Sequence, residues 1–527
     1  MEIKETSFCI NLCSLLALCF ATIIFTKWLC PKRRSTLPLP PGPTGYPIVG
    51  CMPEMMKNKP TFRWIHRLMQ ERNTEIACIR LGNTHVIPVT SPELAREFLR
   101  KQDVVFASRP DCMSGKVTSI GYLTAVLSPI GDQWKKMRRV VASEVLSPAM
   151  HRWLYKKRCE EADHLVRYVY KQSQNSVTNG LVNVRIAALH YCSNVMRKLM
   201  FSKRFFGTGM EDGGPGLEEE EHVDGLFTIL RYLYGFAIAD YLPWLEVFDL
   251  DGYKRIIKNA TKRVRKYQDP EINKRIEMWQ QGTRKTEEDL LDVLINLKNS
   301  KNNLLLSIEE IKAQITEIML AAIDNPSNAV EWALAEMINQ PDILDKACEE
   351  LDQAVGRNRL VDESDLHKLN YIKGCAKEAL RLHPVTPFNV PHLSMEDTVV
   401  GGYFIPKGSH VLLSRPGLGQ NPRVWKDPLV YKPERHIISP NVLDHELCML
   451  SFSTGRRGCP AIVLGSTMTN ILLARLIQGF SWSAPPNGSN NTVDLTESKG
   501  DLSMAKPLLA RAIPRLEPHV YLKLMHS

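Results

Sequence analysis

The sequence lacks the patterns that mark several common functional classes. It has no glycine-rich dinucleotide motif, which argues against a nicotinamide-binding fold in this chain. Its 13 cysteines are an odd number without paired metal spacing, so they indicate reduced thiols on the cytosolic side of a membrane. The net charge is +10, but no basic stripe interleaved with aromatics accompanies it, so we expect no nucleic-acid partner. No linker-like change of composition divides the 527 residues after the N-terminus.

The N-terminus carries an apolar run, residues 8–25, followed by the basic cluster Lys32-Arg33-Arg34. This length spans a bilayer, and the basic C-terminal flank places the rest of the chain in the cytosol. A cleaved signal peptide is the alternative, but the leader is not basic and no small-x-small site precedes Lys27. We expect a single-pass anchor at residues 1–30, a basic and proline-rich hinge at 31–50 and a catalytic domain at 51–527.

Residues 451–464 place one cysteine, Cys459, where a glycine-containing turn meets a helix. Gly455 and Gly458 are expected to adopt positive φ, and Pro460 suits a first helical turn. A thiolate at Cys459 would face the free amides of that turn, and haem iron is one metal held by a single cysteine. The alternative is a buried structural cysteine, which on these residues alone is about as well supported.

This segment resembles the haem-binding loop of the cytochrome P-450 superfamily at Phe452, Gly455, Arg457 and Cys459. Ala461 departs from the pattern, which usually has glycine there. The resemblance implies a mainly α fold with a small β region, haem b ligated by Cys459, and NADPH electrons delivered by NADPH-cytochrome P-450 reductase. It also implies that Phe452 contacts the haem and that Arg457 pairs with a propionate.

A long apolar helix is expected to begin at the capping box of Ser307 and Glu310 and to run to about residue 338. Pro326 interrupts its hydrogen bonding, leaving Asp324 and Asn325 at a polar notch. The alternative is a core helix whose acid pairs elsewhere. The segment resembles the superfamily's oxygen-binding helix, which makes Asp324 and Asn325 the candidate catalytic residues. Asn325 replaces the usual alcohol, as in the plant branch that N-hydroxylates amino acids to aldoximes.

Glu378 and Arg381 are spaced for one face of a helix, where an ion pair contributes little by itself. Together with Arg435 they resemble the superfamily's structural triad, which holds the loop beneath the haem. His436 stands where phenylalanine is more usual, a change that the aldoxime-forming branch shares.

Three further haem contacts follow from the resemblance: Trp134, Arg138 and His392. On the helix containing Trp134, we expect Lys135, Lys136 and Arg139 to face outward and attract an acidic reductase. A solvated helix face without a partner is the alternative. The resemblance also implies pocket residues, of which Arg109 is the candidate for binding a substrate carboxylate; the others are Thr386, Phe388, Asn389 and Leu508.

The resemblance therefore implies a monooxygenase of the endoplasmic reticulum membrane with its catalytic domain in the cytosol. Its substrate would be an L-amino acid, with phenylalanine slightly favoured over aliphatic ones. Two N-hydroxylations, dehydration and decarboxylation would give the aldoxime for plant specialised or defence metabolism. Two alternatives stay open: a C-hydroxylase of terpenoids or phenolics, and a non-catalytic membrane haem-binding protein.

Overall fold

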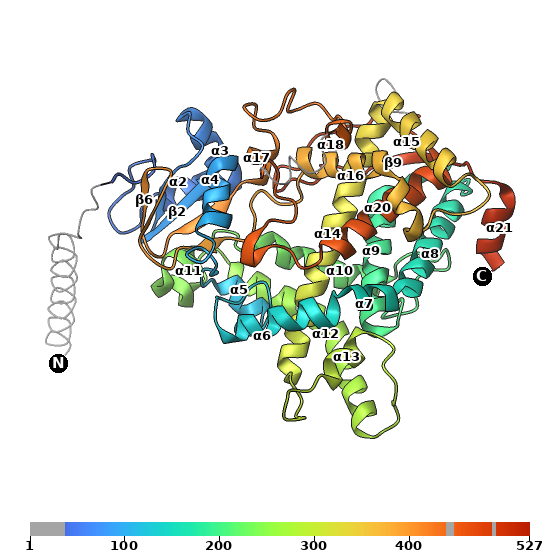
Figure 1. The fold of residues 1–527 in the computed structure, drawn as a ribbon, viewed down its shortest axis with the longest axis horizontal. Coiled ribbons are helices and arrows are strands. Elements are labelled where there is room, and N and C mark those ends of the chain that lie inside the picture. The colour runs from blue at the N-terminus through green and yellow to red at the C-terminus, as the bar shows by residue number, and fades with distance from the viewer. Residues whose placement is uncertain (1–36, 439–446, 487–491, 527) are drawn as a thin grey trace, which may run out of the picture.

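The computed structural model describes residues 37–438, 447–486 and 492–526, and it is mainly helical with a small β content, β2 and β6 lying at one end and β9 toward the other (Figure 1). The expected anchor at residues 1–30 lies outside the described residues. In the first half of the chain the α-helices are α2 Met52–Lys57, α3 Thr61–Glu71, α4 Pro92–Arg96, α5 Met113–Thr118, α6 Asp132–Val140, α7 Pro148–Trp153, α8 Tyr155–Ser173, α9 Val184–Phe201, α10 Leu217–Tyr232, α11 Ile238–Tyr241 and α12 Tyr253–Gln280. In the second half they are α13 Leu290–Asn296, α14 Ile308–Asn339, α15 Pro341–Ala354, α16 Asn370–Leu382, α17 Arg415–Gly419, α18 Arg435–Ile438, α20 Ile462–Gly479 and α21 Pro518–His526.

Short helical segments of other types join these elements. Two are π-helical, Glu97–Lys101 and Val141–Val145, and three are 3-10 helices, Pro243–Phe248, Glu363–Lys368 and Gly455–Arg457. Each π segment continues an α-helix directly, α4 in the first case and α6 in the second.

The described strands form three small sheets. The largest has the order β1-β2-β7-β4, with β1 Ile79–Leu81, β2 Thr84–Val89, β7 His410–Leu413 and β4 His392–Leu393. Its parallel pair, β2 and β7, joins segments more than 300 positions apart. The other sheets are β3-β9-β8, with β3 Leu181–Asn183, β9 Leu509–Pro514 and β8 Phe480–Ser483, and the hairpin β5 Thr398–Val400 with β6 Tyr403–Ile405.

Helix α14 runs through the centre of the molecule and packs against α9, α16 and α20 (Figure 1). Ser307 caps it and Glu310 completes the capping box, as the sequence predicts. The helix continues through Pro326, where Ser327 Oγ donates to the carbonyl of Ile323 at 2.8 Å. Helix α20 is apolar and long enough to cross a membrane, but it is mostly buried, which is typical of a core helix.

A buried ion cluster joins α16 to α18 and contains all three residues of the expected triad. Glu378 accepts bonds from Arg381 Nη2 at 2.7 Å and from Arg435 Nε at 2.9 Å. His436 Nε2 lies 2.8 Å from the other Glu378 oxygen. Burial alone would raise the pKa of Glu378, but the hydrogen bonds from Arg381 and His436 lower it to about 2.

The two arginines of this cluster also hold the chain that leads to the cysteine loop. Arg381 Nη1 donates to the carbonyls of Gly419 and Pro428, and Arg435 Nη1 donates to that of Lys426. Both guanidiniums therefore have backbone acceptors besides Glu378. Removing one partner from such a buried network leaves an uncompensated charge, which costs about 3–5 kcal/mol.

Candidate functional site

The loop before α20 sets the position of Cys459. Gly455 has φ +73°, and a Cβ there would lie 2.5 Å from the carbonyl oxygen of Leu99. Only glycine fits this turn. Gly458 has φ −54°, so the expectation of positive φ there is wrong. Its constraint is steric instead, because a Cβ would lie 3.1 Å from the Gly455 oxygen.

Cys459 lies at the start of α20 as predicted. Its N–H donates to the carbonyl of Phe452 at 2.8 Å, and its Sγ accepts the N–H of Ala461 at 3.3 Å. Burial raises the pKa of this thiol, whereas the Ala461 amide and the charges of Arg138 and Arg415 lower it. A metal ion bound to this sulfur would complete its deprotonation.

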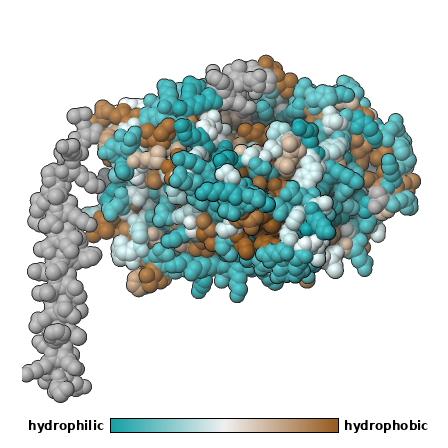
Figure 2. Space-filling model, turned by 60° about the horizontal axis from the view of Figure 1, so that its bottom comes forward, coloured by the Kyte–Doolittle hydropathy of each residue, from teal (hydrophilic) through white to brown (hydrophobic). Residues whose placement is uncertain are grey.

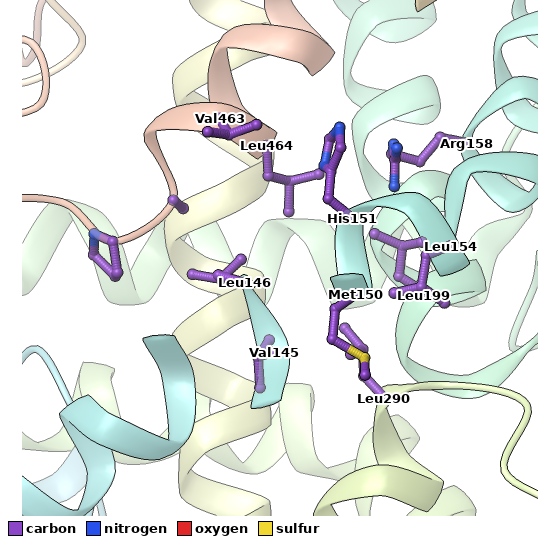
Figure 3. A pocket seen from close by; sticks show the side chains of 12 residues that line it. Val145, Leu146, Met150, His151, Leu154, Arg158, Leu199, Leu290, Val463 and Leu464 are labelled. Atoms are coloured by element: carbon purple, nitrogen blue, oxygen red, sulfur yellow. The ribbon is translucent and has the colours of Figure 1, made fainter. Parts of the chain in front are cut away.

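A small pocket lies beside this loop, where the start of α20 meets α7 and α8 (Figure 3). Pro460 and Ala461 line it, and Leu464 and His151 point toward each other across it (Figure 3). The rest of its lining is mostly apolar. The pocket adjoins the chain directly after Cys459, and its two polar lining side chains, His151 and Arg158, both contact Glu363. We therefore assign it no substrate-binding role.

Arg457 is buried beside Trp134. Its Nε donates to the carbonyl of Ala107 at 2.6 Å and its Nη2 to that of Ser128 at 2.8 Å. The guanidinium carbon lies 4.7 Å from the centre of the Trp134 ring. Burial and repulsion from Arg109 lower the pKa of Arg457 to about 9.

Arg109 and His392 lie in the same region. Arg109 Nη1 donates to the carbonyls of Val390 and Pro391 at 2.8 and 2.9 Å, and burial lowers its pKa to about 10. His392 Nδ1 lies 2.8 Å from the carbonyl of Phe106. Burial and the neighbouring Arg109 lower the pKa of His392 to about 3, so this imidazole is neutral at physiological pH.

These groups form a cationic cluster, which we define as Trp134, Arg109, Arg138, His392 and Arg457. Arg138 Nη2 donates to the carbonyl of Gly458 at 2.7 Å, which ties the cluster to the cysteine loop. Within the described chain, none of its three arginines forms an ion pair with a carboxylate, and the buried Trp134 Nε1 has no acceptor. Buried cations and an unpaired N–H suit an anionic ligand, so the cluster fits the two propionates of a haem ligated by Cys459.

The middle of α14 carries the polar notch expected at Asp324 and Asn325. Asn325 Nδ2 donates to the carbonyl of Ala321 at 2.9 Å, and Ala321 is exposed although the adjacent Leu320 is buried. Burial raises the pKa of Asp324 to about 7, with the charge of Asp501 adding to the effect. Near neutral pH this carboxyl can both give and accept a proton.

Glu317, also on α14, is a residue that sequence reasoning missed. Its carboxylate accepts the backbone N–H groups of Ala125 and Val126 at 3.0 Å and that of Leu127 at 3.1 Å. The same loop supplies the Ser128 carbonyl that holds Arg457. Glu317 therefore positions the cationic cluster indirectly. The signal available in the sequence was the helical spacing of Glu310, Gln314 and Glu317, which places three polar side chains on one face of an apolar helix.

The five residues expected to line the pocket have different surroundings. Phe388 packs on His66 with ring centres 5.2 Å apart, and Thr386 Oγ1 donates to the Phe388 carbonyl. Leu508 is buried in the main core. Asn389 Oδ1 accepts the Nε of Arg415 at 2.7 Å, and sequence reasoning gave Arg415 no binding role.

The outer face of α6 differs in part from the expectation. Lys135 and Arg139 are exposed as predicted. Lys136 is not available for docking, because its Nζ bonds both oxygens of Glu310 at 2.7 and 2.8 Å. Glu310 lies in the first turn of α14, and this turn is close enough to α6 for the two side chains to form an ion pair.

Comparison with known proteins agrees with this geometry. The family model described as Cytochrome P450 matches residues 40–509. Valine N-monooxygenase 2 of Manihot esculenta is 55% identical over 96% of this chain and 94% of its own length. Phenylalanine N-monooxygenase of Arabidopsis thaliana is 56% identical over 94% of each chain. Tyrosine N-monooxygenase of Sorghum bicolor is 55% identical over 93% of this chain and 88% of its own.

Among solved structures, a zebra fish cytochrome P450 with progesterone covers 87% of this chain and all of its own, with a TM-score of 0.70. The sequence identity is 20%, so this likeness concerns the fold alone. It confirms the expected mainly helical fold with a small β region.

The unpaired Trp134 N–H predicts a measurable effect on cofactor retention. Trp134→Phe keeps the ring that Arg457 covers but removes the donor, so we expect haem to leave about 10-fold faster, as for one lost hydrogen bond to a charged group. The measurement is haem transfer from the ferric protein to excess apomyoglobin. Trp153→Phe, at an exposed tryptophan, is the matched control. Equal transfer rates for wild type and Trp134→Phe would show that Trp134 donates no bond to the haem.

Proposed function

This chain belongs to the cytochrome P450 family, and we propose that it converts an L-amino acid to the corresponding aldoxime. The observation that carries the proposal is that the relatives cited above match more than nine-tenths of the chain and are all named amino acid N-monooxygenases. Asn325, in place of an alcohol on α14, supports the same reaction class. A C-hydroxylase of terpenoids or phenolics has no such support from these relatives.

The chain is an enzyme, and haem ligated by Cys459 supplies its oxygen activation with electrons from NADPH through a reductase. The substrate nitrogen is hydroxylated twice. Each hydroxylation consumes one molecule of oxygen, two electrons and two protons and releases one water. The N,N-dihydroxy amino acid then loses water and carbon dioxide, which leaves the aldoxime.

The residues of this chain supply binding and proton control. The cationic cluster orients the haem through its propionates, and Glu317 holds the loop on which that cluster depends. Asp324, with its pKa raised to about 7 by burial, can give or accept a proton near neutral pH. Asn325 donates its amide N–H to a helix carbonyl and is a poor proton relay. We propose that the substrate's own ammonium and hydroxylamine protons supply part of what the missing hydroxyl would give.

The proposal also names the side chain of the amino acid substrate. The relatives named above act on valine, phenylalanine and tyrosine, so both aliphatic and aromatic amino acids occur among them. We propose phenylalanine first, with valine as the aliphatic comparison. All three relatives are plant enzymes, which supports a role in plant specialised or defence metabolism.

We also propose that residues 1–30 anchor the protein in the endoplasmic reticulum membrane, with the hinge at 31–50 and the catalytic domain at 51–527 in the cytosol. Exposed hydrophobic side chains of the segment after α11 support this arrangement: Trp244 at 63%, Val247 at 87%, Phe248 at 68% and Leu250 at 61%. Helix α11 and the start of the described chain lie at the same end of the molecule (Figure 1). Hydrophobic surface is visible at that end (Figure 2).

Deleting residues 1–36 tests the membrane arrangement. The full chain should stay in the microsomal pellet after an alkaline carbonate wash, because a transmembrane helix resists it. The deletion variant should move largely to the supernatant once salt weakens its surface contacts. Retention of the variant equal to that of the full chain would contradict the anchor.

The reaction itself is tested by oxime release. Microsomes carrying this chain, reductase and NADPH are offered each proteinogenic amino acid separately, and products are identified by mass. We expect an aldoxime from phenylalanine or from one other amino acid, with oxygen and NADPH consumed in proportion. A normal thiolate-type carbon monoxide spectrum without oxime from any amino acid would overturn the proposed function.

Asn325→Thr tests the role of the amide on α14. An alcohol side chain at this position alters proton delivery to the haem. We therefore expect the share of consumed NADPH that ends in oxime to fall several-fold. The measurement is oxime formed per NADPH oxidised, with hydrogen peroxide as the competing product. Asn358→Thr, on the surface, is the control. Unchanged coupling in Asn325→Thr would remove Asn325 from the mechanism.

A further inference from the structure

Arg415 is the first residue of α17 and directly follows Ser414 at the end of β7. Backbone bonds hold this position on both sides. The Arg415 N–H donates to the carbonyl of Pro387 at 3.0 Å, and the Asn389 N–H donates to that of Leu413 at 3.0 Å. The side chain therefore starts from a rigid junction between β7 and the loop that contains Asn389.

The guanidinium of Arg415 has one protein partner in the described chain, because Nε donates to Asn389 Oδ1 at 2.7 Å. The four N–H groups on Nη1 and Nη2 therefore have no acceptor among the described residues. No carboxylate of the described residues lies within ion-pair distance, and burial lowers the pKa of this guanidinium to about 10. A half-buried arginine with spare donors and no counter-charge suits an anionic ligand.

The charge of Arg415 acts on Cys459, so the guanidinium lies in the region where haem is ligated. It is nevertheless separate from the cationic cluster. Arg109 and Arg457 repel each other and also interact with Arg138, whereas none of these three arginines is among the charges that act on Arg415. Cys459 interacts with both Arg138 and Arg415 and so lies near both. The cluster already contains enough cations for two propionates, which leaves Arg415 for a different carboxylate.

We propose that Arg415, held in place by Asn389, binds the α-carboxylate of the amino acid substrate. This inference rests on the proposed function and assigns one binding contact within it. A guanidinium offers two parallel N–H bonds to a carboxylate, which fixes the position of the Cα atom and hence of the amino nitrogen. Arg109, the candidate from sequence, is a poorer choice because its Nε and Nη1 already donate to backbone carbonyls.

The test compares two ligands that differ only in the carboxylate. Phenylalanine and phenethylamine share a side chain and an amino group, and each dissociation constant is read from the optical difference spectrum of the haem-loaded protein in microsomes. If the oxime assay identifies another amino acid, that amino acid and its decarboxylated amine replace this pair. Arg415→Gln should weaken amino acid binding by about 10- to 100-fold, the usual range for a lost charge-assisted pair. Binding of the amine should stay unchanged.

Two further variants separate charge from folding. Asn389→Asp keeps Arg415 but places a competing carboxylate on its Nε, so it should also weaken binding of the amino acid and not of the amine. It remains informative if Arg415→Gln fails to fold. Arg423→Gln makes the same chemical change at an exposed ion pair with Glu75 and is the matched control, for which both constants should equal those of wild type.

Four outcomes would overturn the assignment. Equal weakening of amino acid and amine would mean a general disturbance of the site. A lower ratio of haem to protein, without a selective effect on amino acid binding, would make Arg415 a partner of a haem propionate. Unchanged amino acid binding in Arg415→Gln would remove Arg415 while leaving the proposed function intact. Failure of the wild-type protein to bind any amino acid would instead overturn the proposed function together with this assignment.

Discussion

Positive charge on Arg109, Arg138 and Arg457 that no carboxylate pairs directly is the constraint on which the site depends. Arg109, Arg138 and Arg457 lie close enough for their charges to interact, and none has a carboxylate partner in the described chain. Backbone carbonyls satisfy many of their N–H groups but not their charge. An anionic prosthetic group removes the imbalance, and the unpaired Trp134 N–H points to the same ligand. Folding and cofactor binding are therefore coupled here.

Two buried glutamates keep this arrangement in place by different means. Glu378 is ionised and paired, with Arg381, Arg435 and His436 around it, and it ties the chain before the cysteine loop to α16. Glu317 instead accepts hydrogen bonds from three backbone N–H groups of one loop. Burial raises the pKa of Glu317, whereas the pairing of Glu378 lowers its pKa. The first glutamate positions the thiolate side of the site, and the second positions the cationic cluster.

Asn325 and Arg415, the two residues to which a role toward the amino acid substrate is proposed, lie on different elements, α14 and α17. Asn325 donates to a helix carbonyl where the resemblance implies an alcohol, and Arg415 has N–H donors without protein acceptors and interacts with the charge of Cys459. An amino acid differs from terpenoid and phenolic substrates in carrying both a carboxylate and an ionisable nitrogen. A cation for the carboxylate and a reduced need for an enzyme proton relay are the two adjustments that such a substrate requires.

The sequence by itself determined the features whose causes are local. The turn at Gly455, the start of α20 after Cys459 and the capping box of Ser307 and Glu310 follow from residues a few positions apart, and all were predicted. The positive φ expected at Gly458 is wrong, because φ there is −54° and the position is crowded by the Gly455 carbonyl, 3.1 Å from where a Cβ would lie.

Tertiary structure decided which charged groups meet. Lys136 pairs with Glu310, which lies 174 positions away in the sequence. Glu317 accepts the amide N–H of Ala125 at a separation of 192 positions. Arg415 receives its place from Asn389, 26 positions earlier, through the pairing of β7 with the preceding loop. Local patterns show that a residue is charged but not which partner desolvates or neutralises it, because that depends on contacts between segments far apart in the chain.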